Sequence, residues 1–146
     1  MARIRPFNRA NLAGAASTHL RAAIGIGAVV WRFVILVPVS EQRLGEASES
    51  IAEPDDIDAI GAMLSEDFGG VTVLAPMMGH GLRDPQDPTS LELSRHLPFM
   101  VYANPVAPAD RYFGRLEQEL REAFNQGVIL IERQEAFLLT SMASPG

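Results

Sequence analysis

The chain has 146 residues, of which 47% are apolar and 21% charged, a composition typical of one globular domain with a two-layer core. It contains no cysteine and no lysine, which excludes disulfides, thiolate metal sites, cysteine nucleophiles, Schiff-base lysines and a P-loop lysine. The first 32 residues hold five arginines and no acidic residue, whereas the rest holds seven arginines and 18 acidic residues. An acidic body disfavours contact with a phosphate backbone, so we expect no binding of nucleic acid by the folded core.

Residues 1–30 differ from the rest of the chain. Their basic start and small apolar residues faintly resemble a targeting peptide, but Arg21 interrupts the apolar stretch. No run approaches the roughly 18 residues needed for a transmembrane segment. Three interpretations remain open: a poorly ordered or loosely helical extension, a product of an upstream start codon, or a targeting or membrane-contacting segment. The arginines of this arm either bind an anionic partner or fold back on the acidic body.

The domain proper is expected over residues 31–140, followed by a flexible tail over residues 141–146. It opens with a strand-then-helix pattern. The apolar, β-branched residues 31–39 predict a buried central strand, and a polar surface loop follows. A helix is predicted over residues 54–68, because Pro54 suits a first helical position and apolar residues recur there at helical spacing. After a Gly-Gly stop signal, residues 71–75 predict a second strand.

The same pattern occurs a second time. Residues 91–103 predict a strand, and residues 110–124 an amphipathic helix that ends at an Asn-Gln-Gly stop signal. Residues 128–131 predict the fourth strand. A turn over residues 132–135 would then produce a short fifth strand over residues 136–140. The whole reads β-α-β-β-α-β, the outline of an α+β, ferredoxin-like sandwich with an antiparallel sheet and two helices on one face.

Several short motifs carry a resemblance to a known group of proteins. They are Phe68-Gly69-Gly70-Val71-Thr72, then Gly79-x-Gly81-Leu82-x-Asp84, then a strand, the second helix with Gln126, and a valine-containing strand. With these motifs the chain resembles small bacterial proteins of unknown function that have a ferredoxin-like fold, over roughly residues 31–140. An aromatic residue commonly stands in those proteins where this chain has Leu82. The resemblance implies the fold and no particular activity.

The strongest candidate for a site is the predicted turn from Gly79 to Asp87. His80 stands there between two glycines and close to Asp84, so it is a candidate general base with an aspartate to orient it. The alternative is that the two glycines only meet an unusual turn geometry and that His80 is a solvated loop residue without a catalytic role. A second candidate is the polar stripe Glu92-Ser94-His96, continued by Tyr102, which alternates along the third predicted strand. Two interpretations of this stripe remain open: it lines a groove, or it is the ordinary solvent-exposed face of that strand.

Two functions are compatible with these residues. The first is a non-enzymatic module for self-association or ligand sensing, which uses the sheet face that the helices leave open. We expect a bacterial, cytoplasmic homodimer with a possible small-molecule ligand and no transmembrane segment. The alternative is a small cofactor-independent enzyme in which His80, Asp84, His96 and Tyr102 transfer protons. No cofactor-binding or metal-binding motif is present in the sequence, so no cofactor and no metal are expected.

Overall fold

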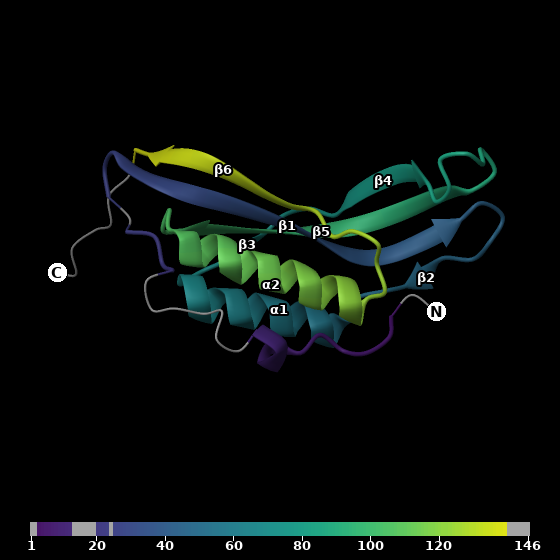
Figure 1. Ribbon diagram of the computed structural model, residues 1–146, viewed down its shortest axis with the longest axis horizontal. Coiled ribbons are helices and arrows are strands. Elements are labelled where there is room, and N and C mark those ends of the chain that lie inside the picture. The colour runs from purple at the N-terminus through teal and green to yellow at the C-terminus, as the bar shows by residue number, and fades with distance from the viewer. Residues whose placement is uncertain (1–2, 13–19, 24, 140–146) are drawn as a thin grey trace.

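The computed structural model describes residues 3–12, 20–23 and 25–139, which form a curled antiparallel sheet with two helices on one of its faces (Figure 1). The protein is therefore of the α+β class, as predicted. No helix among the described residues is long and apolar enough to cross a membrane. The elements in chain order are the 3-10 helix η1 (Arg9–Leu12), β1 (Ala28–Arg43), β2 (Glu49–Ser50), α1 (Pro54–Phe68), β3 (Thr72–Val73), β4 (Met77–Leu82), β5 (Leu91–Ala103), α2 (Ala107–Ala123) and β6 (Ile131–Leu138).

Strands β1 and β5 form the centre of the sheet and pair along almost their whole length, with Trp31 opposite Ala103. On the other side of β1, β6 pairs with its first half and β2 with two residues of its second half. On the other side of β5, β3 and β4 follow one another along the strand. The β1–β5 register shifts at a bulge between Pro38 and Ser40. Both ends of the long strands lift away from the helices, so the sheet curls (Figure 1).

Helix α1 begins and ends where the sequence predicts, because both of its ends carry local signals. Pro54 occupies the first turn, and the backbone N–H of Glu53 donates to the Asp56 carboxylate at 2.9 Å. Gly69 ends the helix with a φ of 85°, in the left-handed region that glycine adopts without strain. The buried apolar face of the helix consists of Ile60, Met63, Leu64 and Phe68.

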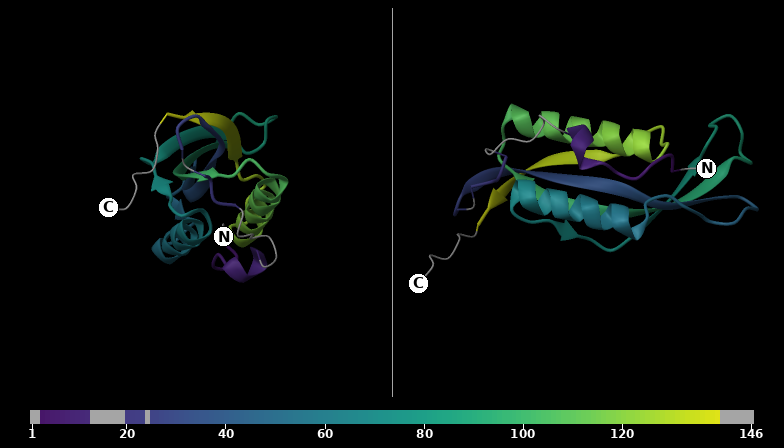
Figure 2. Two further views of the ribbon diagram at one scale, coloured as in Figure 1. Left: turned by 90° about the vertical axis from the view of Figure 1, so that its left-hand side faces the viewer. Right: turned by 90° about the horizontal axis from the view of Figure 1, so that it is seen from below.

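The hydrophobic core lies between the sheet and the two helices, which run side by side beneath it (Figure 2). Phe33 of β1 stacks on Phe113 of α2 with ring centroids 3.9 Å apart, and Phe68 meets Tyr112 edge-on at 4.9 Å. Alternate strand residues project to opposite faces, so the sheet contributes every second residue to this core. Those of β1 and β5 are Phe33, Ile35, Val37, Phe99, Val101 and Ala103.

Residues 3–12, from the segment that the sequence separates from the domain, lie across the helices on the side away from the sheet (Figure 2). Arg5 makes two hydrogen bonds to the buried Glu119, at 2.6 and 2.5 Å, and Arg3 donates to the buried Asp56 at 3.3 Å. Phe7 is buried beside them. Arg3, Arg5 and Arg9 thus pair with acidic groups of the same chain. The predicted tail, residues 141–146, lies outside the described residues.

Strand β4 occupies part of the region for which the sequence predicts only turns. It pairs with β5 in continuous register, with Gly79 opposite Ser94 and His80 opposite Leu93. A Cβ atom at Gly79 would lie 3.2 Å from the Ser94 hydroxyl oxygen, so the glycine allows the close approach of the two strands. Backbone pairing with β5 outweighs the low strand propensity of glycine, and the prediction of a turn from Gly79 onward is wrong at its start.

The predicted C-terminal hairpin is also wrong, because β6 is one continuous strand. It runs through residues 132–135, where the sequence predicts a turn. Its register with β1 is unbroken from Ile131 opposite Ile35 to Leu138 opposite Ala28. Pairing along the whole first half of β1 therefore keeps these polar residues extended. The extra C-terminal strand of the prediction is the second half of β6.

Candidate functional site

The face of the sheet turned away from the helices carries mostly apolar side chains. Directly opposed residues of paired strands project to the same side, and the core takes the odd-numbered residues of β5 and of β1 before its bulge. The even-numbered residues therefore point away from the helices. Val34 opposite Met100 and Leu36 opposite Pro98 form the centre of this face. Pro98 is buried and the other three are half-buried, although no described helix covers them.

The flanking strands extend this apolar surface. On one side, β6 places Ala136 opposite the buried Val30. On the other side, Leu74 donates its N–H to the Pro98 carbonyl at 2.9 Å, and Met77 of β4 lies opposite His96. Leu74 and Met77 are 40% and 52% exposed. We call this surface the open face and define it by Val30, Arg32, Val34, Leu36, Thr72, Leu74, Met77, His96, Pro98, Met100, Tyr102, Glu132, Gln134, Ala136 and Leu138.

One polar row crosses the open face over three strands. Arg32 of β1 lies opposite Tyr102 of β5 on one side and opposite Gln134 of β6 on the other. The Arg32 Nη2 atom donates to the side-chain oxygen of Gln134. Its Nε atom is buried and has no hydrogen-bond partner among the described residues. A cation with one unused buried donor in apolar surroundings is a point where an external acceptor binds favourably.

His96 lies toward the other end of the open face. It is half-buried, opposite Pro38 of β1 and Met77 of β4. Burial lowers the pKa of His96 below its ordinary value, since the charged imidazolium is disfavoured there. The imidazole is therefore neutral at neutral pH, with one donor and one acceptor nitrogen.

The structure does not bring the four predicted site residues together. His96 and Tyr102 share the open face but are six residues apart along β5, which corresponds to roughly 20 Å. His80 is exposed and lies opposite Leu93, so it belongs to the other side of the sheet. Asp84 lies in the turn after β4, where its carboxylate accepts the N–H of Gln86 at 3.0 Å. Asp84 therefore shapes this turn.

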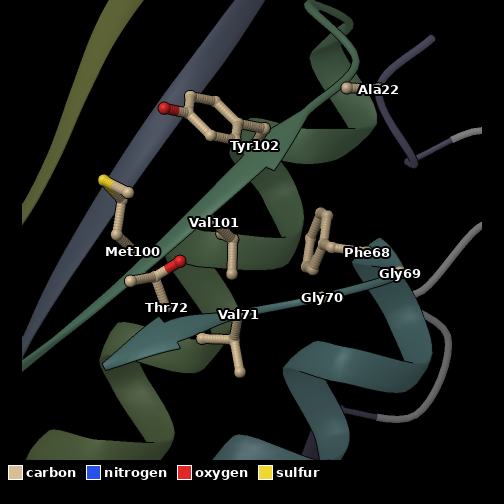
Figure 3. Close-up of a pocket in the computed structure, with 9 residues that line it drawn as sticks. All are labelled: Ala22, Phe68, Gly69, Gly70, Val71, Thr72, Met100, Val101 and Tyr102. Carbon is tan, nitrogen blue, oxygen red and sulfur yellow. The ribbon is translucent and has the colours of Figure 1, made fainter. Parts of the chain in front are cut away.

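Tyr102 also borders a cavity of about 330 Å³ between the end of α1, the start of β3 and the end of β5. In Figure 3, Tyr102 and Met100 extend to one side of β5, whereas Val101 extends to the other side, toward Phe68. Thr72 and Tyr102 are the two lining residues whose side chains carry a hydroxyl group. The cavity has room for a small ligand at the margin of the open face, and sequence reasoning identified only Tyr102 of its residues.

A second cavity of about 330 Å³ contains a pair of carboxylates that sequence reasoning missed. Burial, and then the charge and hydrogen bond of Glu92, raise the pKa of Glu41 above its ordinary value. A carboxyl group with a raised pKa is a candidate for proton transfer. Glu92 belongs to the predicted polar stripe, but Glu41 falls in a segment predicted as a loop. The other lining residues are Arg43, Glu49, Arg83, Asn125, Gln126 and Gly127.

No group of three or more His, Cys, Asp or Glu side chains within residues 3–12, 20–23 and 25–139 is placed to hold a metal ion. No protein-family model and no curated protein sequence matches the chain. Among solved structures, a phage SAM lyase in complex with S-methyl-5'-thioadenosine is similar over 80% of this chain and 93% of that chain. The identity is 13% and the TM-score 0.45, values that do not place the two chains in one family.

Proposed function

We propose that this protein is a non-enzymatic module that forms a homodimer through its open face. The observation that carries the proposal is the uncovered apolar surface at the centre of the sheet, around Leu36, Met100 and the exposed Leu74 and Met77. Complete burial of one Leu or Met side chain contributes about 1.5–3 kcal/mol. Several such side chains together offset the cost of association. A second copy of the same face would cover them symmetrically.

The distribution of charge supports association through this face rather than through the helices. Helix α1 contains five acidic residues and no basic one, whereas the open face contains one arginine and one glutamate, Arg32 and Glu132. Two copies joined through their open faces keep the acidic helix layers on the outer sides of the dimer. Two copies joined through their helices would bring like charges together, which is unfavourable.

We also infer that the fold is a variant of the ferredoxin-like sandwich. The support is the strand order β6-β1-β5 with β3 and β4 beyond β5, antiparallel throughout, and one helix after each of the two central strands. In this variant the second strand is divided into β3 and β4, and β2 is an addition beside β1. The open face is the side of this sandwich that has no helical layer.

The test compares the mass in solution of the full chain with that of two variants. Met77→Asp introduces a charge into the open face at a residue that is 52% exposed, so the fold tolerates it. Leu44→Asp is the matched control, because Leu44 is 66% exposed and lies in the turn between β1 and β2. Light scattering should give a dimer for the wild type and Leu44→Asp and a monomer for Met77→Asp, with the same far-ultraviolet circular dichroism. An equally dimeric Met77→Asp would refute the proposal.

A further inference from the structure

Arg32 has no acidic counterpart within the described part of its own chain. Among the described residues it makes no ion pair, and its polar partner is the neutral side chain of Gln134. Its Nε atom is buried without an acceptor. The neighbours along β1 on the same face are Val30 and Val34, so the surroundings of this cation are apolar. A guanidinium group in such surroundings is satisfied best by a carboxylate, which accepts from Nε and Nη together.

Glu132 is a carboxylate on the same face whose side chain has no oppositely charged partner among the described residues. It lies opposite Val34 on β6, one step along the strand from Gln134, and it is exposed. It makes no hydrogen bond or ion pair within the described part of the chain. Arg32 and Glu132 are therefore diagonal neighbours across two strands, and such neighbours are typically roughly 7–8 Å apart.

We propose that, in the dimer, Arg32 of one copy binds the partner's Glu132, and that the partner's Arg32 binds Glu132 of the first copy. This inference rests on the proposed self-association through the open face. In a two-fold interface, any contact between two different residues occurs twice. A two-fold axis that passes between Arg32 and Glu132 places the cation of each copy opposite the anion of the other. The two ion pairs then fix the register of two otherwise apolar surfaces.

Charge-reversal variants of the full chain test this pairing. Arg32→Glu and Glu132→Arg each place like charges opposite one another, and each should weaken dimerisation about tenfold or more. The double variant Arg32→Glu/Glu132→Arg restores the pairing in the opposite sense and should return the dissociation constant to near the wild-type value. Sedimentation equilibrium at low salt measures the dissociation constants. The effect of each single variant should shrink at high salt, because ions screen the charges.

The controls reverse an arginine and a glutamate on the other side of the same sheet. Arg95→Glu on β5 and Glu135→Arg on β6 change exposed residues whose register places them on the opposite face. They should leave the dissociation constant within about twofold of the wild-type value, which corresponds to ~0.4 kcal/mol. Glu132 is exposed, so Glu132→Arg decides the question even where Arg32→Glu fails to fold.

The failure of this pairing is distinguishable from the failure of the dimer itself. A wild-type dimer whose affinity Glu132→Arg alters no more than Glu135→Arg would overturn the ion pair and leave the proposed function standing. The same holds for a double variant that is as weak as the two singles combined. A wild-type chain that stays monomeric at all concentrations would overturn both.

Discussion

Glu119 determines where the N-terminal arm lies. It is 2% exposed and accepts hydrogen bonds from the Arg5 guanidinium, the Asn8 N–H and the Asn11 amide. Burial alone would raise the pKa of Glu119, but these donors outweigh it and hold the pKa below its ordinary value. The ionised carboxylate thus stabilises the fold above the pKa of an unfolded glutamate. That contribution is lost as the pH falls through the lower pKa of the folded state.

The substitution Arg5→Ala removes the strongest donors of Glu119. It should lower the free energy of unfolding by about 1–3 kcal/mol at pH 7, because a buried carboxylate loses two charge-assisted hydrogen bonds. Urea denaturation measures the loss. Arg111→Ala is the control, since Arg111 is an exposed residue of α2 with no ion pair among the described residues. Equal stability of the two variants would show that the arm contributes little.

Glu41 has the opposite dependence on pH. Its raised pKa means that the folded state binds the proton more tightly, so ionised Glu41 destabilises the fold. Stability attributable to this group falls as the pH rises from the ordinary pKa of glutamate to the raised one. Glu41→Gln should therefore increase the melting temperature at pH 7 and have little effect near pH 3, as thermal circular dichroism would show. A variant less stable than the wild type at pH 7 would contradict this account.

At the scale of elements, local signals determine which parts of the fold are predictable. Helix α1 and strand β5 lie where the sequence predicts, because Pro54 and Gly69 mark the helix ends and β5 is a long run of strand-forming residues. Strand β4 has no such signal in Gly79, His80 and Gly81, and forms because the edge of β5 offers backbone partners. Pairing with the next strand along the chain decided its conformation.

The candidate site was predictable only where it depends on local sequence patterns. Alternation along residues 92–102 placed His96 and Tyr102 on one face, and both lie on the open face. The positions of Arg32 and Glu132 depend on the register between β1 and β6, which local sequence does not specify. Glu41 was hidden for a related reason, because β1 continues past its bulge into a polar segment that reads as a loop.

The C-terminal end of α1 allows a clean test of a backbone effect. Gly69 has a φ of 85°, and a Cβ atom there would meet only the Arg21 side chain, at an ordinary contact distance of 3.7 Å. Gly69→Ala should therefore cost about 1–2 kcal/mol through its backbone conformation alone. Gly70→Ala is the matched control, because its Cβ would meet nothing within 4 Å. Thermal denaturation of both variants should show a lower melting temperature for Gly69→Ala alone.

At the scale of the whole molecule, the two layers leave one side of the sheet without a cover. The helices and residues 3–12 lie on one side, where Arg3, Arg5 and Arg9 pair with some of the acidic side chains of the helices. The opposite side is the open face, with its apolar centre and the unmatched charges of Arg32 and Glu132. In the proposed dimer, a second copy would supply both the apolar cover and the counter-charges.

The mass of the full wild-type chain in solution, measured by light scattering over a range of concentrations, tests that claim most directly. For the proposed dimer we expect a mass that approaches twice the 15.9 kDa of one chain as the concentration rises. A mass that stays at 15.9 kDa at every concentration would contradict it, and the open face would then remain uncovered in the free protein.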